Sequence, residues 1–166
     1  MTARPRATVV VAGFGSEYRR DDGVGPLVAA RAVAEAPLSS DVGPLSDPLD
    51  LLGIWNGADL AIVVDAVDSG GPAGTVRVME MDVSRLSAFD DGTPPAHATA
   101  STHGIGLAGV LRLSRALGQA PRRVVVVGIE GECFDRGQGL SPSVQAAVPE
   151  AVHRVVELIK EVQPCA

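Results

Sequence analysis

The sequence predicts one α/β domain over residues 1–166, a three-layer sandwich with helices on both faces of a sheet. Three short runs of mainly Val, Ile and Ala, at residues 7–13, 60–66 and 123–129, are typical of strands buried on both faces. Segments with apolar residues at helical spacing alternate with these runs, as they do in a parallel sheet with crossover helices. We therefore expect a central, mainly parallel twisted sheet of about five strands, flanked by helices.

The first half of the chain supplies most of the expected strands. After the strand at residues 7–13, residues 22–35 place apolar side chains on one helical face. Residues 49–55 predict a short helix, and the second buried strand follows at residues 60–66. Residues 74–81 alternate apolar and polar side chains, which predicts a strand with one exposed face.

The second half supplies a long loop, the third buried strand and two helices. Residues 89–100 contain Asp-Asp-Gly and Pro-Pro, which predict a loop, and residues 103–117 return to helical spacing. The strand at residues 123–129 follows. The last helix begins at Ser141, a hydroxyl side chain at the N-cap, with Pro142 at the first helical position. Its buried stripe contains Val144, Val148, Val152, Val155 and Ile159.

The composition excludes several classes of function. Fourteen basic residues against twenty acidic ones give a net charge of −6, which argues against a nucleic-acid-binding protein. No apolar run approaches the roughly 20 residues of a membrane span, and the N-terminal run is too short for a signal peptide. Cys133 and Cys165 are too few and too irregularly placed for a disulfide framework, so we expect reduced thiols in a cytoplasmic protein. We also expect the protein to be monomeric.

Polar residues follow the first strand in a glycine-rich segment, GFGSEYRRDDGVG, at residues 13–25. It begins like a dinucleotide-binding fingerprint, but Tyr18 occupies the position of the third glycine. Asp21 and Asp22 lie where a helix should begin, and a carboxylate there is favoured by the helix dipole. Two adjacent acids are more than a helix cap requires, so one of them remains a candidate for a catalytic or ligand-binding role.

Two further segments bring polar side chains to strand or helix ends. Asp65 closes a buried apolar strand, where a carboxylate is costly unless it is hydrogen-bonded, paired or bound to a cation. His103 stands at an expected helix start, whose positive end keeps an imidazole neutral, whereas His97 and His153 lack acidic neighbours. Two carboxylates and one imidazole are compatible with a divalent cation site or with an acid/base pair, and their spacing alone does not choose between these.

In their order along the chain these segments resemble the hydrogenase maturation endopeptidases, which trim the C-terminal tail from the large subunit of nickel–iron hydrogenases. The family opening G-x-G-N then D-[DE]-G-x-G is similar to the segment at residues 13–25, and its strand-ending D-A to residues 65–66. Its S-x-H matches residues 101–103. Its late G-I-E and G-x-x-L-S-x-x-V match residues 128–130 and 137–144.

The resemblance implies an endopeptidase that cuts the large-subunit precursor after nickel insertion. It implies a nickel-sensing site made of Asp22, Asp65 and His103, with the nickel carried by the substrate and no permanent metal on the enzyme. Of the two acids, Asp65 is the better candidate for the base, because burial favours proton uptake by a carboxylate. We expect Asp22 and Asp65 to be catalytic, in an aspartyl-type rather than a serine or cysteine mechanism.

Two departures from the family pattern bear on function. Ser16 replaces the Asn that follows G-x-G, and the D-G-G-T loop expected between Asp41 and Asp50 here contains prolines instead of Gly-Gly. An alternative is therefore a non-enzymatic, nickel-dependent maturation chaperone that binds the immature subunit without cutting it. A hydrolase with a permanent metal of its own is a third possibility, although the sequence has no HExxH-type motif.

Overall fold

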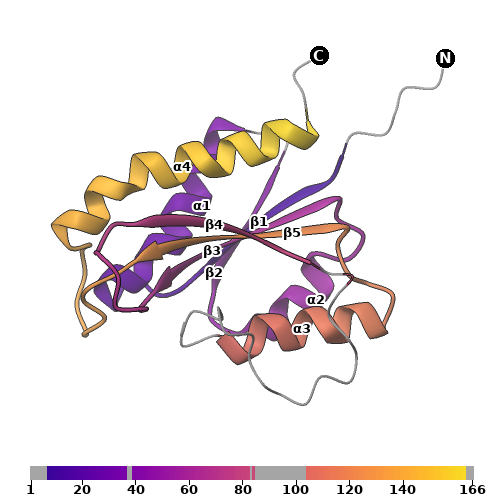
Figure 1. The fold of residues 1–166 in the computed structure, drawn as a ribbon, viewed down its shortest axis with the longest axis horizontal. Helices are drawn as coiled ribbons and strands as arrows, with labels where there is room; N and C mark the ends of the chain where they lie inside the picture. The colour runs from indigo at the N-terminus through magenta and orange to yellow at the C-terminus, as the bar shows by residue number, and fades with distance from the viewer. Residues whose placement is uncertain (1–6, 37–38, 83, 85–103, 164–166) are drawn as a thin grey trace.

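The protein forms a five-stranded sheet between two layers of helices (Figure 1). This computed structural model describes residues 7–36, 39–82, 84 and 104–163; the loop expected at residues 89–100 lies outside them, as does His103. The sheet order is β2-β1-β3-β5-β4, in which β4 alone is antiparallel to its neighbour. The strands are β1 (Val9–Phe14), β2 (Ser40–Leu45), β3 (Leu60–Val67), β4 (Val76–Met81) and β5 (Arg123–Glu130).

The helices divide between the two faces of the sheet, as expected for a three-layer sandwich (Figure 1). One face is covered by α1 (Val24–Glu35) and α4 (Pro142–Val162), and the other by α2 (Leu51–Ile54) and α3 (Gly104–Ala116). Two separate apolar clusters fill the two interfaces. Two short 3-10 turns, η1 (Arg20–Gly23) and η2 (Pro48–Asp50), precede α1 and α2.

The three apolar runs form the centre of the sheet. β1, β3 and β5 are adjacent and parallel, and every residue of β1 and β3 is buried. Helices cover both faces of these strands, so neither set of alternating side chains meets water. The prediction that these runs form buried strands of a mainly parallel sheet is confirmed, and they are its three innermost strands.

The segment between Asp41 and Asp50 is more ordered than the sequence indicates. Its first part pairs with β1 as the edge strand β2, and the Asp47 side chain accepts the Leu49 N–H at 2.9 Å to begin η2. Gly106 of α3 packs closely against Pro48: a Cβ added to Gly106 would lie only 2.3 Å from the proline ring. The expected loop is therefore an edge strand and a capped turn supported by α3.

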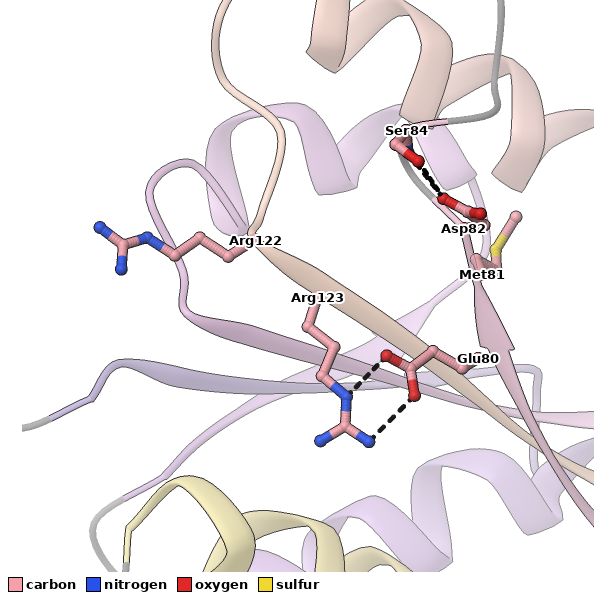
Figure 2. A pocket seen from close by; sticks show the side chains of 6 residues that line it. All are labelled: Glu80, Met81, Asp82, Ser84, Arg122 and Arg123. Carbon is pink, nitrogen blue, oxygen red and sulfur yellow. Dashed lines mark hydrogen bonds and ion pairs between the residues drawn. The ribbon is translucent and has the colours of Figure 1, made fainter.

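A shallow hollow of about 430 Å³ lies where β4 ends and β5 begins, at the amino edge of the parallel strands (Figure 2). Arg123 donates there to Glu80 at 2.9 and 3.1 Å and to Glu161 of α4 at 2.8 Å. These ion pairs connect β4 and α4 to the first residue of β5, at the amino ends of the parallel strands. Within the described residues, no helix is long and apolar enough to cross a membrane.

Candidate active site

The polar segments singled out in the sequence follow β1, β3 and β5, and in a parallel sheet these ends meet at one edge. The register pairs Gly13 with Val64, so β1 ends close to the level of Asp65, and it pairs Val67 with Glu130, so β3 and β5 end together. The turn η1 follows β1 and contacts β3. Asp22, on η1, and Asp65, near the end of β3, therefore belong to segments that touch; β3 continues to Val67, beyond the residue expected to close it.

Two glycines bring these segments together. A Cβ on Gly25 would lie 2.4 Å from the Phe14 carbonyl oxygen and 2.6 Å from that of Val64, the residue before Asp65. A Cβ on Gly13 would lie 2.6 Å from the Pro26 Cα. The first turn of α1 thus rests directly on the ends of β1 and β3. Gly13, the first glycine of the fingerprint-like stretch, and Gly25 in α1 thus each permit the close approach of one backbone to another.

Asp22 is buried but keeps one oxygen unused. The side chain is 6% exposed, and its Oδ2 accepts the Ser16 N–H at 2.9 Å. Among the described residues no donor reaches its Oδ1. Ser16, which replaces the family Asn, accepts the Tyr18 N–H at 3.3 Å through its hydroxyl and so bonds locally, as its short side chain suggests. Asp22 thus has a fixed orientation and an oxygen available to a ligand or a proton.

Asp21 has the opposite environment. It is fully buried, and its carboxylate accepts the N–H groups of Glu132 and Cys133 at 3.0 and 2.9 Å and that of Ser141 at 2.7 Å. The Ser141 hydroxyl also donates to it, at 2.8 Å, instead of capping α4 as expected. Burial raises the pKa of Asp21, but the bonds from Glu132 and Ser141 outweigh burial and hold the pKa below its ordinary value. Asp21 is therefore the acid with the structural role.

Glu130, at the end of β5, is a second buried structural acid, which the sequence analysis matched only as part of a motif. Its carboxylate accepts the Ser69 N–H at 2.7 Å, the Ser69 hydroxyl at 2.6 Å and the Gly71 N–H at 3.3 Å. Burial raises its pKa, yet these bonds and the nearby charge of Arg77 leave the pKa lower than usual. Glu130 holds the turn after β3 in the way that Asp21 holds the loop after β5.

The loop after β1 and the loop after β5 are also joined through their main chains. Arg20 N–H donates to the Gly137 carbonyl at 2.9 Å, and Gly137 N–H donates to that of Tyr18 at 2.9 Å. Arg20 has φ = 50°, while the other positive-φ positions of the described chain are all glycine. A left-handed conformation costs an arginine about 1–2 kcal/mol. We call these joined loops, residues 16–20 and 131–141, the lip of the candidate site.

The expected third member of the site, His103, lies outside the described residues. Within those residues, no three metal-ligand side chains of the His, Cys, Asp or Glu type gather. His153 lies on α4 with its Nε2 3.2 Å from Glu157, so the expectation that it lacks an acidic neighbour is wrong. Both side chains of that pair are well exposed. Of the three expected site residues, the described part of the chain contains Asp22 and Asp65, and the buried acids Asp21 and Glu130 lie on neighbouring segments.

Comparison with known proteins identifies a family with this architecture. The sequence model of the hydrogenase maturation protease family, HycI, matches residues 46–158. The hydrogenase 2 maturation protease of Escherichia coli K12 is 26% identical over 157 residues, covering 92% of this chain and 91% of that protein. The hydrogenase expression/formation protein HoxM of Cupriavidus necator is 29% identical, covering 92% and 74%.

The fold agrees with this comparison. The structure of the hydrogenase maturating endopeptidase HybD from E. coli superimposes with a TM-score of 0.76 at 23% identity, covering 93% of both chains. That structure shares the α/β fold, and the family match extends over more than half of the present chain. The protein belongs to the hydrogenase maturation protease family.

Proposed function

We propose that this protein is the cytoplasmic endopeptidase that removes the C-terminal extension of a nickel–iron hydrogenase large-subunit precursor after nickel insertion. Family membership establishes a protease of hydrogenase maturation. The observation that carries the finer proposal is the unequal use of two adjacent acids. Asp21 accepts several hydrogen bonds through both oxygens, whereas Asp22 has one oxygen that no donor among the described residues reaches, next to the strand that contains Asp65.

In the proposed reaction Asp65 is the general base. It takes a proton from water as the water oxygen attacks the scissile carbonyl carbon, and a proton is then delivered to the nitrogen as the C–N bond breaks. Asp22 and His103 hold the nickel of the precursor, which is part of the substrate and not a resident cofactor. Nickel held in this way fixes the scissile bond near Asp65, so that only a loaded precursor is positioned for cleavage.

Asp22 is suited to holding a substrate ion because its orientation does not depend on that ion. The Ser16 N–H fixes one carboxylate oxygen, and burial excludes most of the water that would screen the other. Asp21, the residue before it, holds the turn to the loop after β5 through both of its oxygens. The ligand atom is thus placed by the fold before the substrate arrives, which reduces the entropy lost on binding.

The test is cleavage of purified precursor, with and without nickel, by wild type and by D22N, D65N and H103A. We expect wild type to cut only nickel-loaded precursor and each variant to lose about 100-fold or more in rate, the usual effect of removing a general base or positioning group. D59N is the matched control, because Asp59 accepts the Thr8 N–H at the opposite edge of the sheet. C133A should also retain activity, because no thiol takes part.

Equal cleavage of nickel-free precursor, or activity that survives both D22N and D65N, would overturn the mechanism. The chaperone alternative predicts a different result, namely tight binding of loaded precursor by wild type with no tail removal under any condition. A permanent metalloenzyme would retain stoichiometric metal after dialysis. Metal analysis of the purified protein therefore tests the proposal that nickel arrives with the substrate.

A further inference from the structure

We infer that Arg20 binds a carboxylate of the protein substrate and thereby sets which precursor is accepted, an inference that rests on the proposed function. The first observation is the backbone of Arg20. Its φ of 50° is disfavoured for every residue with a Cβ, and glycine occupies the other positive-φ positions in the described chain. Glycine at residue 20 would remove this cost. The arginine side chain is therefore retained in a strained position, and strain of this kind is typical of functional sites.

The second observation is the orientation of the guanidinium. Its Nε, Cζ and Nη2 atoms all lie 3.1 Å from the point that a Cβ on Gly137 would occupy. The planar group therefore lies against the Gly137 backbone, and the hydrogen bond from Arg20 N–H to the Gly137 carbonyl fixes the same pair of residues. The lip therefore covers one side of the guanidinium.

The third observation is that the charge of Arg20 has no partner in the described part of the protein. The side chain is exposed, and no hydrogen bond or ion pair joins it to the acids of the lip, Glu17, Glu132 and Asp135. A guanidinium that packs in one orientation and keeps its N–H edge unbonded has already lost part of its conformational entropy. It is therefore suited to the bidentate binding of a carboxylate.

The fourth observation is that Arg20 lies close along the chain to Asp22, the proposed ligand of the substrate nickel. Arg20 and Asp22 belong to the same 3-10 turn, and Asp21 between them is fully buried with its carboxylate saturated. A carboxylate held by Arg20 would thus be held in a fixed relation to Asp22. Either the terminal carboxylate of the precursor or an Asp or Glu side chain near its cleavage site provides this chemistry.

The experiment compares R20A, R20G and R20K with wild type in precursor cleavage, precursor binding by calorimetry and thermal unfolding. R20A keeps the backbone strain and loses the guanidinium, whereas R20G loses both. We expect KM and Kd to rise about tenfold in R20A and R20G, the usual range for one charged contact. R20K should be intermediate because ammonium does not bind a carboxylate bidentately. R20G should unfold at a higher temperature than R20A. These KM changes should shrink at high salt.

R122A is the control, since the Arg122 side chain is 85% exposed and lies at the opposite edge of the sheet (Figure 2). It should leave KM and Kd unchanged. A precursor with an amidated C-terminus separates the two sources of the carboxylate. If the R20A effect disappears with that substrate, Arg20 binds the chain terminus; if the effect persists, it binds a side chain.

KM and Kd within twofold of wild type in both R20A and R20G would overturn the inference, as would losses that follow the unfolding temperature alone. Failure of the proposed function gives a different result. If wild type binds precursor without cutting it, the endopeptidase assignment falls, and the Kd values of the variants still decide the role of Arg20. If wild type does not bind precursor at all, both conclusions fall.

Discussion

Asp21 and Asp22 are neighbours in sequence and equally acidic, yet the fold gives them different tasks. Asp21 accepts hydrogen bonds from three backbone N–H groups and one hydroxyl, all from the segment after β5. From the residues that the structure describes, Asp22 accepts one, donated by Ser16 in its own loop. Both are almost fully buried. Burial alone therefore does not separate the two acids, whereas their hydrogen-bond partners among the described residues do.

The geometry of η1 explains this separation. Successive side chains on a 3-10 turn project about 120° apart, so adjacent residues face different parts of the protein. One direction leads to the loop after β5 and the N-terminus of α4, where Asp21 finds its donors. Another leads back to the loop after β1, where Asp22 accepts the Ser16 N–H. Two adjacent acids on a single turn therefore face different parts of the protein and make different hydrogen bonds.

The largest expected effect of this difference is on stability. D21A should lower the free energy of unfolding by about 3–4 kcal/mol, because it leaves several buried donors without an acceptor. D22A should cost only about 1 kcal/mol, the value of a single hydrogen bond. Urea unfolding of both variants measures the contrast. Similar losses in the two variants would show that Asp21 is not the main link between the lip and α4.

A second prediction concerns the contact that joins the two halves of the site. G25A should destabilise the protein by about 2–3 kcal/mol, the range for overpacking, because the new Cβ meets two backbone carbonyls that are unable to move independently. It should also reduce cleavage, since relief of the clash moves Asp22 away from the strand of Asp65. G109A is the matched control: its Cβ meets no atom within 4 Å, so it should stabilise α3 by roughly 0.5–1 kcal/mol.

Denaturant unfolding and the cleavage assay together separate the two effects of G25A. Loss of stability with unchanged cleavage would mean that the relation between η1 and β3 tolerates movement. Destabilisation by G109A would mean instead that helix propensity is not the deciding quantity in α3.

Much of the fold could be predicted from the sequence because its strongest signals are local. The Val-rich runs that became β1, β3 and β5 are buried on both faces, so their continuous apolar pattern identifies them directly. The edge strand β2 was harder to foresee, since its residues are mostly exposed and include Gly43 and Pro44. Its strand structure depends on pairing with β1, and the sequence of residues 40–45 has no local pattern that predicts this pairing.

The site shows the same limit. The sequence indicated that one of two adjacent acids was in excess of a helix cap, and the family resemblance selected Asp22. The partners of Asp21 lie more than 100 positions away, at Glu132, Cys133 and Ser141, so local reasoning had no access to them. Ser141 was expected to cap α4 because serine before proline usually does. A buried carboxylate is the stronger acceptor, and it takes the hydroxyl instead.

The smallest predicted effect is on how steeply stability falls with decreasing pH, and it tests whether Asp21 and Glu130 act as structural carboxylates. Hydrogen bonds hold the folded-state pKa of Asp21 and of Glu130 below their ordinary values of 3.8 and 4.5. The unfolded chain therefore takes up protons first as the pH falls, and the stabilisation is complete above about pH 4.5 and lost as the pH drops through the folded-state values. D21N and E130Q should unfold more easily at neutral pH but show a shallower loss of stability on acidification, measured as urea midpoints from about pH 7 to pH 3. Acid sensitivity equal to that of wild type in both variants would place the titrating groups elsewhere. The effect is small because protonation removes only the extra stability that the hydrogen bonds give to the ionised carboxylate. D21A, in contrast, removes the acceptor of these hydrogen bonds altogether.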